Sequence, residues 1–147
     1  MSDIIELIIA RVRELTAGLT ATNEKGEAVA IAIDDSGELP DGSSESGDCP
    51  FVIVRETSGD INDPDETINI LVMAGLYVPA GGKDGRERIR DLKDILARIP
   101  QQSFTGHGFT GSIKYEYGVE GRQEPHHFYV RLRLSFIRES EIFSYTE

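Results

Sequence analysis

The sequence predicts an α+β fold, a mainly antiparallel sheet of about five strands with two helices, ordered helix, three strands, helix, two strands. Two segments, near residues 3–19 and 84–99, place apolar residues at the three- and four-residue spacing of a helix. Five others have the alternating or unbroken apolar runs of strands: 27–33, 50–56, 67–79, 111–118 and 127–137. Strands that follow one another without a helix between them favour antiparallel pairing. The 147 residues fit one domain, 1–147.

The first helix is predicted to bury a stripe along most of its length. Ile4 and Ile9 widen this stripe, and Gly18 is the expected stop. Its central members lie three or four residues apart: Ile5, Ile8, Val12, Leu15 and Leu19. The segment "EAVAIAI" then alternates small and branched apolar residues, which predicts the first strand.

Residues 34–48, "DDSGELPDGSSESGD", predict a mobile acidic loop. The segment holds six acidic residues and no basic one, together with three glycines and four serines, so it has almost nothing to bury. If the protein forms a ring, this segment is expected to serve as an assembly loop or to face the lumen of the ring. Its candidate residues are Asp34, Asp35, Glu38, Asp41, Glu45 and Asp48.

The middle of the chain predicts two strands and the second helix. The unbroken run in "PFVIVRE" indicates a strand buried on both faces. A polar loop over 57–66 is expected before the strand at 67–79, in which Gly75 suggests a bulge or bend. Asp84 is the expected cap of the second helix and Pro100 its end. Its buried stripe is predicted to be Ile89, Leu92, Ile95, Leu96 and Ile99.

The last two strands predict a face with local positive charge. From His127 the residues alternate strictly, so that Phe128, Val130, Leu132, Leu134 and Phe136 share one side of a half-buried strand. If the two strands pair, the other side is either a solvated outer face or a subunit interface, where arginine and tyrosine are enriched. The candidate interface residues are Lys114, Glu116, Tyr129, Arg131 and Arg133.

The sequence predicts no catalytic, metal or cofactor site. His126 and His127 are consecutive and would point to opposite sides of a strand, while His107 lies in a glycine-rich segment. The stretch "GGKDGRERI" lacks the first glycine and the Ser or Thr of a phosphate loop. The aspartates of "DINDPDE" lack the spacing of a calcium loop, and Cys49 has no evident base beside it. We therefore expect a protein that is not an enzyme.

The net charge and the cysteine content limit which partners the protein is expected to bind and in which compartment it is expected to act. A net charge of −11 argues against sequence-specific or general nucleic-acid binding, although DNA can pass an acidic wall without adhering. The N-terminal apolar stretch is interrupted by charges, so neither a signal peptide nor a membrane span is expected. A single cysteine excludes an internal disulfide and indicates a reducing compartment or indifference to redox, so the cytoplasm is the default expectation.

The order of these elements resembles the small tail-terminator and tail-completion proteins, or minor tail proteins, of long-tailed bacteriophages. The resemblance covers nearly the whole chain and is carried by an amphipathic N-terminal helix, "PFVIV", "GLY", "DGRERIRDLKDIL" and "PHHFYVRLRLSF". It implies a structural subunit that forms a ring, commonly a hexamer, at the end of the tail tube. Such a ring stops polymerisation and presents a surface to the head-completion or connector protein. The acidic segment is longer and more acidic than this pattern requires.

Three hypotheses follow from the sequence. The first is the phage tail assembly protein, with other copies of itself, the tail tube protein and the connector as partners. It would be found in the host cytoplasm during assembly and then in the virion tail. The second is a small, non-enzymatic module of the bacterial cytoplasm that binds an acidic protein partner. The third is an enzyme or metal protein that uses His107, His126 or His127 together with aspartates.

Overall fold

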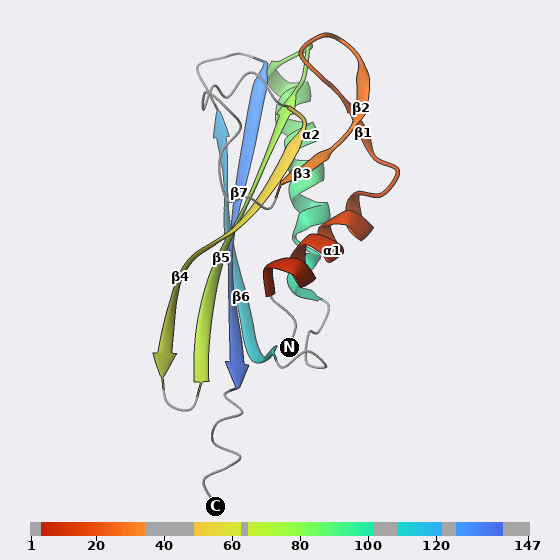
Figure 1. Ribbon diagram of the computed structural model, residues 1–147. Helices are drawn as coiled ribbons and strands as arrows, with labels where there is room; N and C mark the ends of the chain where they lie inside the picture. The colour runs from red at the N-terminus through yellow and green to blue at the C-terminus, as the bar shows by residue number, and fades with distance from the viewer. Residues whose placement is uncertain (1–3, 35–48, 63–64, 102–108, 122–125, 140–147) are drawn as a thin grey trace, which may run out of the picture.

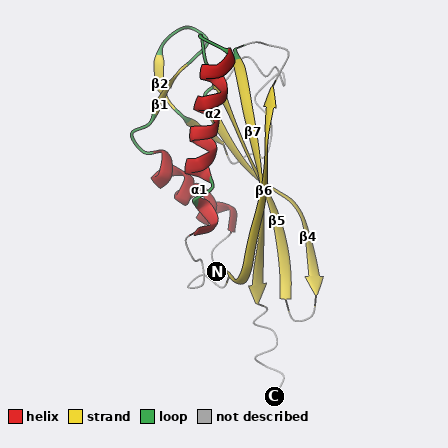
Figure 2. Cartoon of the chain, turned by 180° about the vertical axis from the view of Figure 1, so that it is seen from behind, coloured by secondary structure: helices red, strands yellow, loops and turns green. Residues whose placement is uncertain are grey.

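The structure is a computed structural model that describes residues 4–34, 49–62, 65–101, 109–121 and 126–139; for strand β6 it describes the backbone alone. Within these residues, a five-stranded sheet carries both helices on the same face (Figures 1 and 2). The elements are α1 (Ile4–Thr16), β1 (Thr20–Thr22), β2 (Ala28–Ala30), β3 (Ala32–Asp34), β4 (Phe51–Asn62), β5 (Asp65–Tyr77), α2 (Gly82–Leu96), the 3-10 turn η2 (Ile99–Gln101), β6 (Phe109–Gly121) and β7 (His127–Glu139).

The predicted α+β class with two helices is confirmed. The large sheet has the strand order β3-β4-β5-β7-β6. All of its pairs are antiparallel except β3 with β4, which run parallel. The sheet is therefore mainly antiparallel, as hairpin-connected strands favour.

The predicted order of elements is wrong near the N-terminus, because residues 27–33 do not form one strand. They divide into β2, which pairs with β1 in a separate hairpin, and β3, which joins the large sheet. The turn of the hairpin is held by Asn23, whose Oδ1 accepts hydrogen bonds from the backbone N–H of Lys25 and of Glu27, each at 2.9 Å. An Asn side chain that bonds its own backbone in this way favours a turn, and Gly26 supplies a positive φ of 82°.

The predicted loop at 57–66 is also wrong, because β4 continues to Asn62 and β5 begins at Asp65. Polar side chains in this region satisfy one another across the strands. The side chain of Asn69 donates to Ser58 Oγ at 3.0 Å, and its Oδ1 accepts from Ser135 Oγ at 3.1 Å. Asn69 thus links β4, β5 and β7 beside the segment where the composition alone suggests a loop. The pairing also shifts register between Glu56 and Ser58.

The main core lies between the helices and the sheet. From α1 it takes Ile8 and Val12 of the predicted stripe, with Ile4 and Ile9, whereas Ile5, Leu15 and Leu19 are only partly buried. From α2 and the following turn it takes four of the five predicted residues, and Ile95 is half-buried. The sheet supplies the alternating side of β7 that the sequence predicts, together with β4 and β5. The fully buried members on β7 are Val130, Leu132, Leu134 and Phe136.

The ends of α2 differ from the prediction. The helix begins at Gly82, two residues before the expected cap Asp84, and Gly81 is its N-cap residue. Gly81 and Gly82 both have positive φ angles, which glycine adopts at little cost and which allow a tight turn from β5 into the helix. The helix ends at Leu96, and Pro100 lies within the following 3-10 turn.

Candidate assembly face of the sheet

The face of the sheet that points away from the helices is the candidate functional surface. The register of β4, β5 and β7 aligns its residues in three rows, and we call these nine positions the open face. No residue of either helix belongs to the apolar cluster on this side. The rows are Phe51–Gly75–Tyr129, Ile53–Met73–Arg131 and Arg55–Leu71–Arg133.

The upper end of the open face is buried. Phe51, Met73 and Tyr129 belong to a small apolar cluster together with Cys49 and Ile53. The rings of Phe51 and Tyr129 lie 6.1 Å apart in a tilted arrangement. This cluster explains why the run from Phe51 to Val54 is buried on both sides of the strand, as the sequence predicts.

Gly75 allows the rings of this cluster to meet across the sheet. A Cβ atom at this position would lie 2.5 Å from Phe51 Cε2 and 3.0 Å from Tyr129 Cδ1. The pairing of β5 with β4 and with β7 is continuous through Gly75, so the predicted bulge is absent there. The glycine is required here because a side chain would collide with the two rings.

The lower part of the open face is a basic groove, which we call the arginine groove. It has a volume of about 360 Å³ and is lined by Ile53, Arg55, Thr57, Leu71, Met73, Arg131 and Arg133. Its apolar residues come from β4 and β5, and none of the described residues that line it is acidic. Three arginines, whose guanidinium groups stay charged at any physiological pH, therefore line the groove together with three apolar residues. The positive charge of such a groove attracts carboxylates.

The structure places the five predicted interface residues in different environments. Arg133 is exposed and Arg131 is half-buried, and both line the groove. Tyr129 is 0% exposed, so its ring belongs to the buried upper cluster and not to an accessible surface, which differs from the expectation. The predicted pairing of the last two strands is present, and its register sets Lys114 opposite Ser135 and Glu116 opposite Arg133. The side chains of Lys114 and Glu116 lie outside the described part of the structure.

Arg55 is a member of the groove that the sequence did not indicate. It follows the apolar run of β4 and is exposed. The sequence does indicate that Arg55 lies on the same side of its strand as Phe51 and Ile53, because residues two apart in a strand share a face. The missing information was the strand order, since only the placement of β5 between β4 and β7 brings Arg55 to the same groove as Arg131 and Arg133.

The acidic segment is anchored at one edge of the sheet. Its first residue, Asp34, ends β3 and pairs in register with Ile53. The chain returns at Cys49, immediately before β4. The segment therefore leaves and rejoins the sheet on the β3–β4 side. The other candidate residues lie outside the described residues, as does the predicted mobility of the loop: Asp35, Glu38, Asp41, Glu45 and Asp48.

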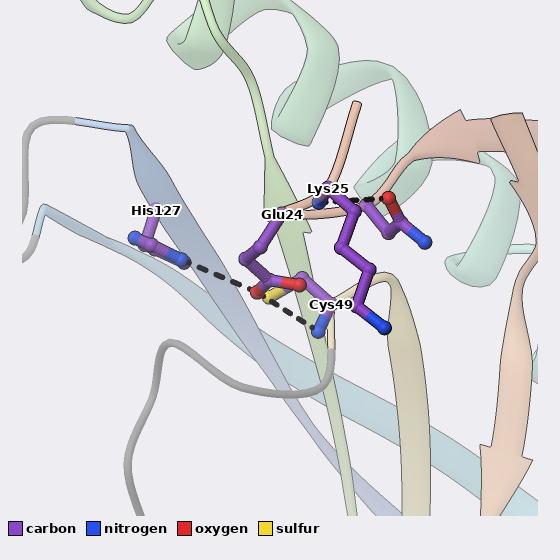
Figure 3. A network of polar contacts seen from close by, with 5 residues as sticks. Glu24, Lys25, Cys49 and His127 are labelled. Atoms are coloured by element: carbon purple, nitrogen blue, oxygen red, sulfur yellow. Dashed lines mark hydrogen bonds and ion pairs between the residues drawn. The ribbon is translucent and has the colours of Figure 1, made fainter. Parts of the chain in front are cut away.

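The histidine at the start of β7 joins three segments at the upper end of the sheet. His127 is buried, and its Nε2 lies 3.3 Å from Glu24 Oε2 (Figure 3). The same carboxylate oxygen accepts a hydrogen bond from the backbone N–H of Cys49, also at 3.3 Å. Glu24 lies in the β1–β2 turn, so the contact ties that hairpin to the beginnings of β4 and β7. This arrangement accounts for His127 as a structural residue.

The other candidates for chemistry are less organised. The ring of His126 lies 5.9 Å from that of Tyr77, and His107 lies outside the described residues. Within the described part of the chain, no group of three or more His, Cys, Asp or Glu side chains is placed to hold a metal ion. A second cavity of about 420 Å³ lies between the β1–β2 hairpin, the end of β5 and α2. On its rim the carboxylate of Asp84 is paired with Arg88 at 3.0 Å.

Comparison with known proteins gives no family for this chain. No protein-family model matches it, and no curated protein matches it in sequence. Among the described helices, none is long and apolar enough to cross a membrane.

Proposed function

We propose that this protein is a structural subunit of a phage tail that forms a ring, of six copies, at the end of the tail tube. The ring terminates polymerisation of the tube and provides the surface to which the head is joined. The observation that carries the proposal is the arginine groove, a charged and apolar surface on the side of the sheet that neither helix covers. Apolar area beside clustered arginine is typical of protein interfaces.

A ring requires two different surfaces that meet head to tail, and the chain offers two of opposite charge. One is the arginine groove, with three guanidinium groups. The other is the acidic segment 34–48 of the neighbouring copy, with six carboxylates and no basic residue. We propose that this segment approaches the groove of the next subunit. Opposite charges would speed association and fix its direction, because like-charged surfaces repel.

The remaining partners follow from the resemblance and from the net charge. One side of the ring would contact the tail tube protein, and the other the head-completion or connector protein. With −11 charges per subunit, a ring can let DNA pass through without binding it. The protein would act in the bacterial host cytoplasm during assembly and remain in the virion tail. In this function it performs no catalysis and needs no cofactor.

Charge reversal in the groove tests the proposal. We expect the double variant Arg131→Glu, Arg133→Glu to lose assembly while the monomer stays folded, because the groove would then repel the acidic segment. The measurement is the native mass by light scattering over a range of concentrations, with and without tail tube protein. Thermal melting followed by circular dichroism reports the folding of the monomer.

The matched control makes the same change of charge on the other layer of the molecule. Arg86 and Arg90 are exposed residues of α2, and the variant Arg86→Glu, Arg90→Glu should assemble like the parent protein. If the groove variant also assembles like the parent, the groove is not the interface. If the parent is monomeric both alone and with tail tube protein, the proposed ring itself is wrong.

If no ring forms, the same groove favours a second function, the binding of an acidic partner by a monomer. A groove lined by three arginines and three apolar residues also suits an acidic peptide that carries one apolar side chain. In that case the protein is a monomeric binding module with a protein partner. A strict monomer that binds one acidic partner, and loses it on the same charge reversal, would favour this second function.

A further inference from the structure

The large sheet has two edges on which the described part of the chain offers no strand partner. On one side, β3 pairs with β4 only through Phe51, Val52 and Ile53. Over residues 56–62, β4 has no described strand on its outer side. On the opposite side, β6 is the last strand of the sheet over its full length. An edge of this kind presents backbone N–H and C=O groups that another strand can bind.

The β4 edge is exposed and extends beyond the helices. Residues 56–59 are all exposed. Ile61 is 84% exposed and is the one large apolar side chain so exposed among the described residues. The lower ends of β4, β5 and β7 project past both helices (Figures 1 and 2). This edge therefore combines accessible backbone with an apolar side chain that the monomer does not bury.

The directions of the strands determine which edges can meet in a ring. Each of the pairs β4–β5, β5–β7 and β7–β6 is antiparallel, so β6 runs opposite to β4. In a ring, all copies keep the same direction relative to the axis. When the β6 edge of one copy lies against the β4 edge of the next, the two strands are therefore antiparallel. The alternation of directions continues from copy to copy without a break, in the more stable kind of pairing.

We propose that the β4 edge at residues 56–62 binds the β6 edge of a second copy, so that the sheets of neighbouring subunits join. The inference rests on the proposed function, because it names the surface through which that ring closes. It also agrees with the charge argument. The acidic segment is anchored on the β3–β4 side of the sheet, and this side would face β6 of the neighbouring copy. The next strand of that neighbour is β7, which carries Arg131 and Arg133.

Backbone blocking is the first test. The N–H groups of neighbouring residues in a strand point to opposite sides, so one of Asp60 and Ile61 donates toward β5 and the other toward the open edge. We compare Asp60→Pro and Ile61→Pro with Asp60→Ala and Ile61→Ala, which keep the N–H. The proline on the outward side should leave thermal melting unchanged and weaken association by about tenfold relative to its alanine control.

Directed cross-linking is the second test and holds even if both proline variants unfold. Two proteins are prepared, and in both the native cysteine is removed by Cys49→Ala. The first carries Ser58→Cys on β4. The second carries one new cysteine on β6, by Lys114→Cys, Glu116→Cys or Gly118→Cys. The register places all these positions on the side away from the helices. Mixing should give disulfide-linked pairs between the β4 cysteine and one of the β6 cysteines. Each protein alone should give few.

The outcomes separate the two proposals. Suppose that the parent assembles but no disulfide joins a β4 cysteine to a β6 cysteine, either because β4 links to β4 and β6 to β6 or because no cross-link forms. The edge inference is then overturned, and the proposed ring stands. Normal assembly of a fully folded outward-proline variant overturns it as well. If the parent itself stays monomeric with and without tail tube protein, the proposed function fails, and the edge inference fails with it.

Discussion

The two faces of the large sheet differ in how far their burial extends. On the helix side, buried apolar residues continue along β7 from Phe128 to Phe136. On the open face, the same strand is buried at Tyr129, half-buried at Arg131 and exposed at Arg133. The helix-side face is thus buried from Phe128 to Phe136, whereas the open face is buried only at its upper end. Most of the stability should lie on the first face, whereas the lower part of the second remains available for binding.

The largest effect is expected where the helices cover the sheet. Ile89 of α2 is 0% exposed and packs in the main core, so Ile89→Ala should lower the free energy of unfolding by about 2–5 kcal/mol. The same change at Ile61, which is 84% exposed, should alter it by only about 0.5 kcal/mol. Urea unfolding of both variants in the monomeric state measures the difference. Equal effects at the two positions would contradict this account of the core.

A smaller effect is expected in the buried upper end of the open face. Gly75→Ala places a methyl group 2.5 Å from the ring of Phe51, so the ring must move, and we expect a loss of about 1–3 kcal/mol. The change Phe51→Leu replaces the ring with a smaller side chain and so removes this steric clash. The double variant should therefore be more stable than the sum of the two single losses predicts. Strict additivity in a urea-unfolding cycle would show that the two residues do not interact.

The sequence identifies which residues share a face better than it identifies what covers that face. The alternation from His127 onward places Tyr129, Arg131 and Arg133 together, and the register agrees. Their burial could not be predicted, because it depends on Phe51 and Met73 from other strands and on the small residue Gly75 between them. The groove member Arg55 was missed for the same reason, since its neighbours are set by strand order and not by local pattern.

Local composition also misled where tertiary pairing decides the structure. Residues 57–66 are rich in turn-forming types, yet most of them lie in β4 and β5, because β7 supplies a pairing surface for β5 and Asn69 bonds to both of its neighbours. Strand preference depends on such cross-strand contacts more than on intrinsic propensity. The helices and the apolar strand 51–54 were predictable because their patterns are strong and local.

The polar cross-strand link should have an intermediate effect. Asn69→Ala removes the donor to Ser58 and the acceptor for Ser135, and we expect a loss of about 1–2 kcal/mol in the free energy of unfolding. Hydrogen exchange should increase mainly at the lower ends of β4 and β7, because these strand ends project past the helices. Ser58→Ala removes one of the two bonds and serves as the control. A variant as stable as the parent, with unchanged exchange, would contradict this role.

The smallest effect on the monomer is expected in the arginine groove, where the effect on assembly should be clear. Arg133 is exposed, so Arg133→Gln should change the free energy of unfolding by no more than about 0.5 kcal/mol. Its loss should weaken association and reduce the dependence of association on salt, because one screened charge contact is removed. Light scattering at low and high ionic strength, with Arg90→Gln as the control on α2, measures both quantities. A destabilised monomer would place Arg133 with the core-forming residues, and an unchanged salt dependence would remove it from the interface. If the variant keeps its stability but associates more weakly and with less dependence on salt, the lower part of the open face serves binding. Its upper part then serves the stability of the fold.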